Sequence, residues 1–344
     1  MGSYPHYRGG VSTWCDMLIT GLPQVSFDLI SFTANPNAEV VYPLPGNVTN
    51  LRTIPLWGTS DVLEMKRDLG LLEVIQHKTS ISQQAIQTFV PIFRRFLQIL
   101  WSKESHPREF GKVLFEMASY FMYHDYDATM KSMPVWDCFV EEGRLGYKAY
   151  AEEVGIEGNV TLLDITDAKR LLYRWLTLLT MPIPDSDIVH TAMAGLCCIP
   201  GILANEAHGT PFLLTEHGVY LRERLLSLAR HKTSAFDQVF QARFDQHLTE
   251  ASYQYATKIA PGSNYNHRWE LQNGARPEQI QTIYNGPDPE QFVPGPYNSD
   301  ETPPKIVFLG RIDPLKDIQT LVAAAAVVHR EMPEVKFKIY GKAP

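Results

Sequence analysis

Cysteine, positive charge and long apolar stretches are all scarce in this sequence of 344 residues. The 4 cysteines show no Cys-x-x-Cys spacing and no histidines at zinc-ligand intervals, which favours buried free thiols over a redox or metal role. Lys plus Arg total 31 against 38 for Asp plus Glu, and the resulting net charge of −7 argues against a nucleic-acid-binding protein. The longest wholly apolar run, Leu321 to Val328, is far shorter than the ~20 residues that span a bilayer.

Hydrophobic residues are nevertheless plentiful, at 44% of the chain with 11% aromatic, which is enough to form a large core. No basic segment followed by an apolar one opens the sequence, so nothing in it resembles an export signal. We therefore expect a cytoplasmic protein that would associate with a membrane only through its partners.

Two kinds of hydrophobic pattern alternate along residues 1–286. Before about residue 61 and after about residue 180, short apolar segments typical of strands alternate with amphipathic segments typical of helices. Between these positions strand signals almost vanish and apolar residues recur at helical spacing. We expect an α/β fold, a Rossmann-like lobe over 1–286 with a helical insertion at about 61–180. The expected strands are Phe27–Phe32, Asn50–Leu56, Asp187–Thr191, Pro211–His217, Lys258–Ala260 and Gln281–Tyr284, and the expected helices after the insertion are Met193–Ala207, Val219–Arg230, Phe236–Ala256 and Asn264–Asn273.

A proline-rich segment at 287–304 is typical of a linker, and a second α/β unit follows it at 305–344. This unit has one strand–helix–strand pattern, at Lys305–Leu309, Ile318–Arg330 and Val335–Tyr340. One βαβ unit cannot bury both faces of a parallel sheet, so we expect the second lobe to be truncated. We expect the amino end to be cut as well, because no strand precedes the glycine-rich loop; the alternative is that Met1 is a true start.

That glycine-rich loop is the first candidate binding motif. Gly9 and Gly10 let the backbone approach a ligand closely, and the free amides of the helix that follows favour an anion such as phosphate. Ser12 either caps this helix or donates a hydrogen bond to the phosphate. The structural alternative is an ordinary Gly-Gly loop.

Two further motifs carry residues suited to a ligand. His190 and His217 end two expected parallel strands, the edge at which ligands bind in α/β sheets, although a lone histidine is more often structural. Arg311 and Lys316 lie in the turn after the strand at Lys305–Leu309, where two cations suit a diphosphate leaving group. The structural alternative for this pair is a solvated strand–helix connection.

One acidic motif is discounted. Asp125 and Asp127 form the Asp-x-Asp pattern that holds a metal–nucleotide in one class of sugar transferases, but they lie in the helical insertion with no further ligand cluster around them. We interpret them as surface acids and predict no metal and no other cofactor.

Together these motifs resemble family-4 glycosyltransferases, and within them the PelF-like group of exopolysaccharide enzymes. The resemblance rests on four segments in the same order along almost the whole chain: Tyr4–Trp14, Thr215–Arg224, Ile283–Asp288 and Leu309–Asp317. It implies a GT-B fold with two Rossmann-like lobes, the amino-terminal one on the acceptor side and the carboxy-terminal one binding the nucleotide-sugar. It also implies retaining, metal-independent transfer of a hexose from a nucleotide-sugar, expected to be a UDP-sugar, to a growing polysaccharide.

The resemblance also assigns roles to individual residues. Gly9, Gly10 and Ser12 would approach the donor diphosphate, His217 would lie near the transferred sugar, and Arg311 with Lys316 would hold the diphosphate. Asn285 would belong to the interlobe hinge. The catalytic set is thus His217, Arg311 and Lys316.

The sequence departs from the family pattern in ways that matter for activity. The first strand with its Glu-Gly, and the Glu-x7-Glu region that grips ribose and sugar, are both missing, so we expect an incomplete and inactive fragment.

One alternative is a non-catalytic interaction subunit that docks onto a membrane-bound polysaccharide synthase through the helical insertion. A third hypothesis, a dinucleotide-dependent oxidoreductase, lacks the G-x-G-x-x-G motif after a strand.

Overall fold

The computed structural model describes residues 3–57, 82–156, 158–287, 289–290, 292–295 and 303–341. The chain divides into two compact units, Met1–Asn285 and Gly286–Pro344. The start of the expected helical insertion, at 61–81, and parts of the expected linker lie outside the described residues. Within the part that is described, no helix is long and apolar enough to cross a membrane.

The strands of the first unit pair in parallel, as the alternation of strands and helices predicts. β1 (Phe27–Thr33) pairs with β2 (Val48–Pro55), and β4 (Phe212–Glu216) lies between β3 (Val189–Thr191) and β5 (Lys258–Pro261). In the described residues these are two separate small sheets rather than one continuous sheet. The mixed α/β class is therefore confirmed, with short parallel sheets.

Long helices replace strands between the two sheets, as predicted for the helical insertion. α3 presents five side chains at helical spacing that are fully buried, and this apolar stripe packs on α4 and α6. Gly146 of α6 permits close contact with α3, since a Cβ atom there would lie 2.3 Å from the Trp101 ring. The helices are α3 (Gln83–Trp101), α4 (Pro107–Phe121), α5 (Tyr126–Met130), α6 (Met133–Val154) and α7 (Leu162–Leu176), followed by the 3-10 turn η2 (Thr177–Thr180).

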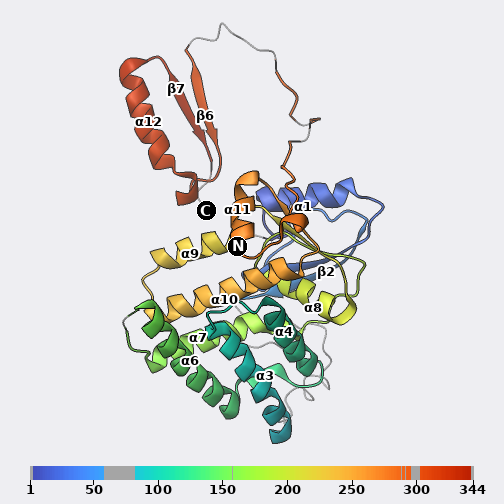
Figure 1. Ribbon diagram of the computed structural model, residues 1–344. Helices are drawn as coiled ribbons and strands as arrows, with labels where there is room; N and C mark the ends of the chain where they lie inside the picture. The colour runs from blue at the N-terminus through green and yellow to red at the C-terminus, as the bar shows by residue number, and fades with distance from the viewer. Residues whose placement is uncertain are drawn as a thin grey trace. The chain divides into compact units, whose positions relative to one another are not determined.

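The remaining helices of this unit lie close to their expected positions. The short 3-10 turn η3 (Leu196–Cys198) precedes α8, and Pro200 is accommodated in the first turn of α8, where no intrahelical N–H bond is lost. The longest of these helices, α10, contacts α4 and α7 on one side and α8 and α9 on another, so it joins the helical insertion to the α/β part (Figure 1). Their bounds are α8 (Ile199–His208), α9 (Tyr220–Arg230), α10 (Ala235–Tyr255) and α11 (Asn264–Gln272), with a 3-10 turn, η4 (Pro277–Gln279), after α11.

One expected strand, Gln281–Tyr284, does not form as a regular strand. The chain there runs parallel to β5 and makes two backbone bonds, from Gln281 N–H to Ile259 at 2.9 Å and from Ile283 N–H to Pro261 at 2.9 Å. It extends the sheet edge only partly, because a single β-bridge, at Ile280, is formed.

The glycine-rich loop is fixed to the first sheet by buried polar side chains. His6 in the loop contacts the Thr53 hydroxyl of β2 at 3.0 Å, and Ser31 of β1 donates to the Tyr4 carbonyl at 2.8 Å. Asn47 donates to the carbonyls of Ile19 and Leu22 at the end of α1 (Gly10–Gly21), both at 3.0 Å. The loop is thus held near the carboxyl ends of β1 and β2, and the end of α1 lies beside the amino end of β2.

The second unit has parallel strands β6 (Lys305–Leu309) and β7 (Lys336–Tyr340), a 3-10 turn η5 (Pro314–Lys316) and helix α12 (Ile318–Glu331). α12 has no buried residue, and Leu309 of β6 is 83% exposed. The first unit, by contrast, buries a continuous cluster of aromatic and aliphatic side chains. Because apolar burial is the main stabilising contribution, the second unit is the less stable part.

We expect limited proteolysis of this chain to digest residues 286–344 first and to leave a resistant core of about residues 1–285. The reason is the difference in apolar burial between the two units, since a protease cuts the segments that open most easily. Mass spectrometry of the digestion products at several time points checks this. Equal resistance of both units would contradict it.

Candidate functional site

Trp14 of α1 lies against the two histidines that the sequence analysis singled out. Its ring is 4.7 Å from the His217 ring and 5.6 Å from the His190 ring, centroid to centroid, and meets both edge to face. His190 lies within β3, and His217 directly follows β4. The glycine-rich loop, through the first turns of its helix, thus meets the carboxyl ends of two parallel strands. This is where α/β folds bind ligands.

His217 has a ring nitrogen whose hydrogen-bonding capacity is unused. Its Nε2 atom is buried without a hydrogen-bond partner in the described part of the chain. Burial lowers the pKa of His217 below its ordinary value, which favours the neutral imidazole. A neutral imidazole with an unpartnered nitrogen can form a hydrogen bond with a ligand hydroxyl.

His190 is tied into the sheet. Its Nε2 shares a hydrogen bond with the Thr215 hydroxyl of β4 at 2.8 Å. Burial, with a smaller contribution from His217, lowers its pKa to about 4, so it is neutral at pH 7. This cross-strand contact gives His190 a structural role beside His217.

Two fully buried carboxyl groups lie behind His217, and sequence reasoning did not find them. Glu216 accepts the Tyr220 N–H at 3.1 Å and the Tyr253 hydroxyl at 2.5 Å. Glu270 of α11 is also fully buried, and no described group donates to its oxygens. Burial raises the pKa of Glu216 to about 7; burial, and then the Glu216 charge, raises that of Glu270 to about 8. We expect the two carboxyls to share a proton, because the Glu216 charge raises the proton affinity of Glu270, which has no other donor among the described residues.

We expect Glu270→Gln to make the free energy of unfolding less dependent on pH between about 5 and 8, the range from the ordinary pKa of a glutamate to the raised pKa values of the pair. Both carboxyls have raised pKa values when folded, so the folded chain holds protons that the unfolded chain has lost. Wild-type stability therefore falls as pH rises through this window, by up to about 1.4 kcal/mol per pH unit for each extra proton. Chemical denaturation at several pH values measures the slope.

A matched control is Glu152→Gln on α6, because that carboxylate is exposed and makes only a loose contact with Lys148, at 3.9 Å. This control is expected to keep the wild-type slope. The same slope in Glu270→Gln as in the wild type would show that the buried pair does not share a proton.

Residues of α9, which follows His217, are held by contacts with Asp245 of α10. Asp245 accepts the Tyr220 hydroxyl at 2.8 Å and pairs with Arg224 at 2.8 Å, and it is almost fully buried. Burial has the largest effect on the pKa of Asp245 and raises it, whereas the nearby Arg224 charge lowers it by a smaller amount. Tyr220 and Arg224 in the segment Thr215–Arg224 thus fix α9 to α10, which is a structural function.

The two glycines of the loop have free space around them. A Cβ atom on Gly9 or on Gly10 would meet nothing within 4 Å, so packing in the described chain does not require glycine at either position. Gly9 is the N-cap of α1, and Ser12 is 3% exposed and makes no capping bond. The capping role considered for Ser12 is therefore wrong, because the helix begins earlier than that role requires. Its diphosphate role stays a prediction.

One known protein family matches the part of the chain that contains the candidate site. A family model described as a domain of unknown function, DUF3492, matches residues 1–278. The chain belongs to the DUF3492 family. The match includes the loop at Gly9–Gly10, both histidines and the buried pair of carboxyls. A search of curated proteins finds no match.

Arg311 and Lys316 lie outside the DUF3492 match, in the second unit. Both are in the turn between β6 and α12, as predicted, and both are exposed. Arg311 pairs with Asp313 at 3.3 Å, and the Asp313 side chain also accepts the Lys316 N–H at 3.2 Å. An exposed ion pair of this kind contributes only about 0–1 kcal/mol to the free energy of folding. Arg311 can therefore leave Asp313 and bind an anionic ligand instead. Their binding role stays a prediction.

The discounted acidic motif has structural partners in the DUF3492 domain. Asp125 caps α5 by accepting the Ala128 N–H at 2.6 Å, and Asp127 accepts the Tyr173 hydroxyl at 2.6 Å. Asn285, the predicted hinge residue, lies at the boundary between the two units, and its amide is 3.8 Å from the position of a Cβ built on Gly262.

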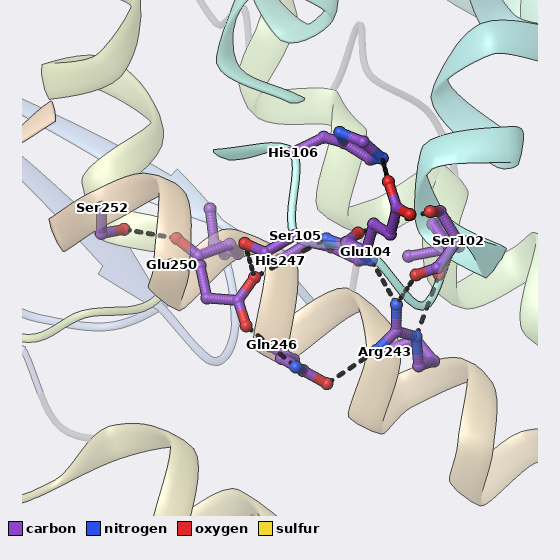
Figure 2. Close-up of polar contacts among 11 residues, drawn as sticks. Ser102, Glu104, Ser105, His106, Arg243, Gln246, His247, Glu250 and Ser252 are labelled. Atoms are coloured by element: carbon purple, nitrogen blue, oxygen red, sulfur yellow. Dashed lines mark hydrogen bonds and ion pairs between the residues drawn. The ribbon is translucent and has the colours of Figure 1, made fainter. Parts of the chain in front are cut away.

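A second buried polar cluster was also missed by sequence reasoning. Figure 2 shows Arg243 of α10 reaching Ser102, in the loop that follows α3, where it donates to the Ser102 carbonyl. Arg243 also donates to the carbonyl of Leu100, in the last turn of α3, at 3.2 Å. It also contacts His247 Nε2 at 2.8 Å, while Glu250 accepts the Ser105 hydroxyl at 2.7 Å. Burial, followed by the Arg243 charge, lowers the pKa of His247 to about 3 and keeps it neutral. The cluster joins the helical insertion of the DUF3492 domain to α10.

Proposed function

We propose that this chain contains the acceptor-side lobe of a GT-B-type glycosyltransferase and a strand–helix–strand unit of its donor-binding lobe. The enzyme would be similar to family-4 and PelF-like transferases. It would move a hexose from a nucleotide-sugar, a UDP-sugar, to a growing polysaccharide, with retention of configuration and without a metal. The protein would be cytoplasmic, in keeping with the 4 free cysteines of the described chain, and would reach the membrane through a synthase complex.

The observation that supports this proposal most is the contact of Trp14 with His190 and His217. Two motifs separated by about 200 residues in the sequence meet at the carboxyl ends of β3 and β4. A ligand there would find the amides after Gly9 and Gly10, and the His217 imidazole, whose Nε2 has no hydrogen-bond partner in the described chain. These groups suit a diphosphate and a sugar hydroxyl, respectively.

In the proposed reaction His217 makes a hydrogen bond to the transferred sugar, and the loop amides face the diphosphate. Arg311 and Lys316 would add two positive charges as the negative charge on the leaving nucleotide grows. Cations and amides aimed at that charge stabilise the transition state more than the ground state.

The proposal is tested on the intact protein, meaning an enzyme in which both lobes are complete. The purified intact protein is incubated with UDP-glucose or UDP-N-acetylglucosamine and a polysaccharide acceptor, with and without EDTA. We expect release of UDP that depends on the acceptor and is insensitive to EDTA. Absence of UDP release with both donors, together with capture of a polysaccharide synthase subunit, would favour the non-catalytic alternative.

A further inference from the structure

Two exposed arginines flank one tryptophan beside the proposed site. Arg222, in the first turn of α9, lies 5.8 Å from the centre of the Trp269 ring, and Arg268 lies 5.3 Å from it. Arg268 also stacks on Tyr265, at 4.3 Å from the ring centre. Neither arginine has a carboxylate partner among the described residues. This Arg222–Arg268 cluster therefore carries two uncompensated positive charges in a chain whose net charge is −7.

The position of Arg222 is unfavourable for the helix that carries it. A cation in the first turn of a helix opposes the macrodipole, which favours acidic residues there. Glu223, the neighbouring carboxylate, does not neutralise it, because its side chain folds back against Gly218. Helix stability therefore does not account for an arginine at position 222.

Tyr265 lies next to both arginines. It is 54% exposed, and its pKa is lowered first by a hydrogen bond from Arg268, then by the Arg268 charge, and least by the Arg222 charge. The beginning of α11, capped by Ser263, adds the positive end of a second helix.

Stacking also fixes how these arginines present their hydrogen-bond donors. The N–H groups of a guanidinium that are not engaged by a neighbouring side chain match the two oxygens of a carboxylate. The half-exposed ring of Tyr265 adds apolar surface to the cluster. The combination suits a ring-shaped ligand that carries a carboxylate.

We propose that the Arg222–Arg268 cluster binds the carboxylates of an acidic saccharide, and that the acceptor chain is therefore a uronate-containing polysaccharide. The identity of the acceptor rests on the proposed transferase function, but the binding of an acidic saccharide does not. α9 and α11 begin just after the parallel strands β4 and β5, so the cluster lies at the same edge of the sheet as His217.

The test is a calorimetric titration of the intact protein with tetragalacturonate, without any nucleotide-sugar. We expect saturable binding that weakens about tenfold in Arg222→Gln and in Arg268→Gln, the usual scale for one charged hydrogen bond. Binding is also expected to weaken from 50 to 300 mM NaCl. The fully methyl-esterified tetramer, which has the same rings without the charges, is expected not to bind.

Arg144→Gln on α6 is the matched control, because it removes an equally exposed arginine with no ion pair among the described residues. It is expected to bind tetragalacturonate like the wild type. Equal weakening in this control, equal binding of the esterified tetramer, or Arg222-dependent binding of UDP but not of the uronate would overturn the proposal. Failure of UDP release in the transferase assay would leave this binding result unchanged, so the two proposals fail separately.

Discussion

His217→Ala is expected to lower the kcat of sugar transfer by about 10²–10³-fold, the usual loss when one preorganised contact to the reacting group is removed. Its Nε2 is buried without a hydrogen-bond partner in the described chain, its ring packs on Trp14, and burial favours the neutral form. Because His217 makes no hydrogen bond within the described chain, alanine should cost little stability. The measurement is steady-state UDP release, with thermal unfolding followed on the same sample.

His190→Ala is the matched control for this prediction. It removes the hydrogen bond to Thr215 and leaves a buried hydroxyl without its partner, which costs about 1–3 kcal/mol of stability. We expect a clear fall in Tm with a much smaller change in kcat. The opposite pattern, in which His190→Ala stops turnover and His217→Ala mainly unfolds the chain, would show that the two histidines have been assigned the wrong roles.

Lys316→Ala is expected to lower kcat at least as much as it weakens donor binding. The expected loss of transition-state stabilisation is about 2–4 kcal/mol, the usual scale for one preorganised electrostatic contact. Lys316 provides a point charge in the turn after β6, and Arg311 provides a fork for two phosphate oxygens. The charge on a leaving diphosphate rises in the transition state, so both contacts strengthen there. The measurement is a donor titration of the intact protein with UDP-glucose and with UDP-N-acetylglucosamine.

Lys338→Ala provides the control, because it removes an exposed lysine from β7 in the same unit but away from the turn. It is expected to keep wild-type kcat and KM. If Lys316→Ala also kept wild-type turnover, the pair would have no part in the mechanism and the turn would be a structural connection only.

Local sequence patterns predicted the elements of the fold well because each pattern reflects burial along one helix or strand. The stripe Phe89, Phe93, Phe96, Leu97 and Leu100 lies on one buried face of α3, as its spacing indicates. The boundaries of β6 coincide with the expected strand. The division into two small sheets was not predictable, since strand patterns do not specify which strands pair.

The candidate site was predicted only in part. His190 and His217 could be placed because parallel strands direct their carboxyl ends to one edge. The contact of both with Trp14, the buried Glu216–Glu270 pair and the Arg243 cluster depend on segments far apart in the sequence. Glu270 in particular occupies a helix position that an exposed glutamate could fill equally well, so nothing in the local sequence indicates its burial.

The most direct test of the proposed glycosyltransferase function is a time-resolved proton NMR spectrum of the intact protein with a UDP-sugar and an acceptor oligosaccharide. The account predicts that the anomeric signal of the α-linked donor is replaced, mole for mole with UDP, by the signal of an α-linked product, because transfer retains configuration. A β-linked product would contradict retention, and an unchanged donor signal would contradict the transferase itself.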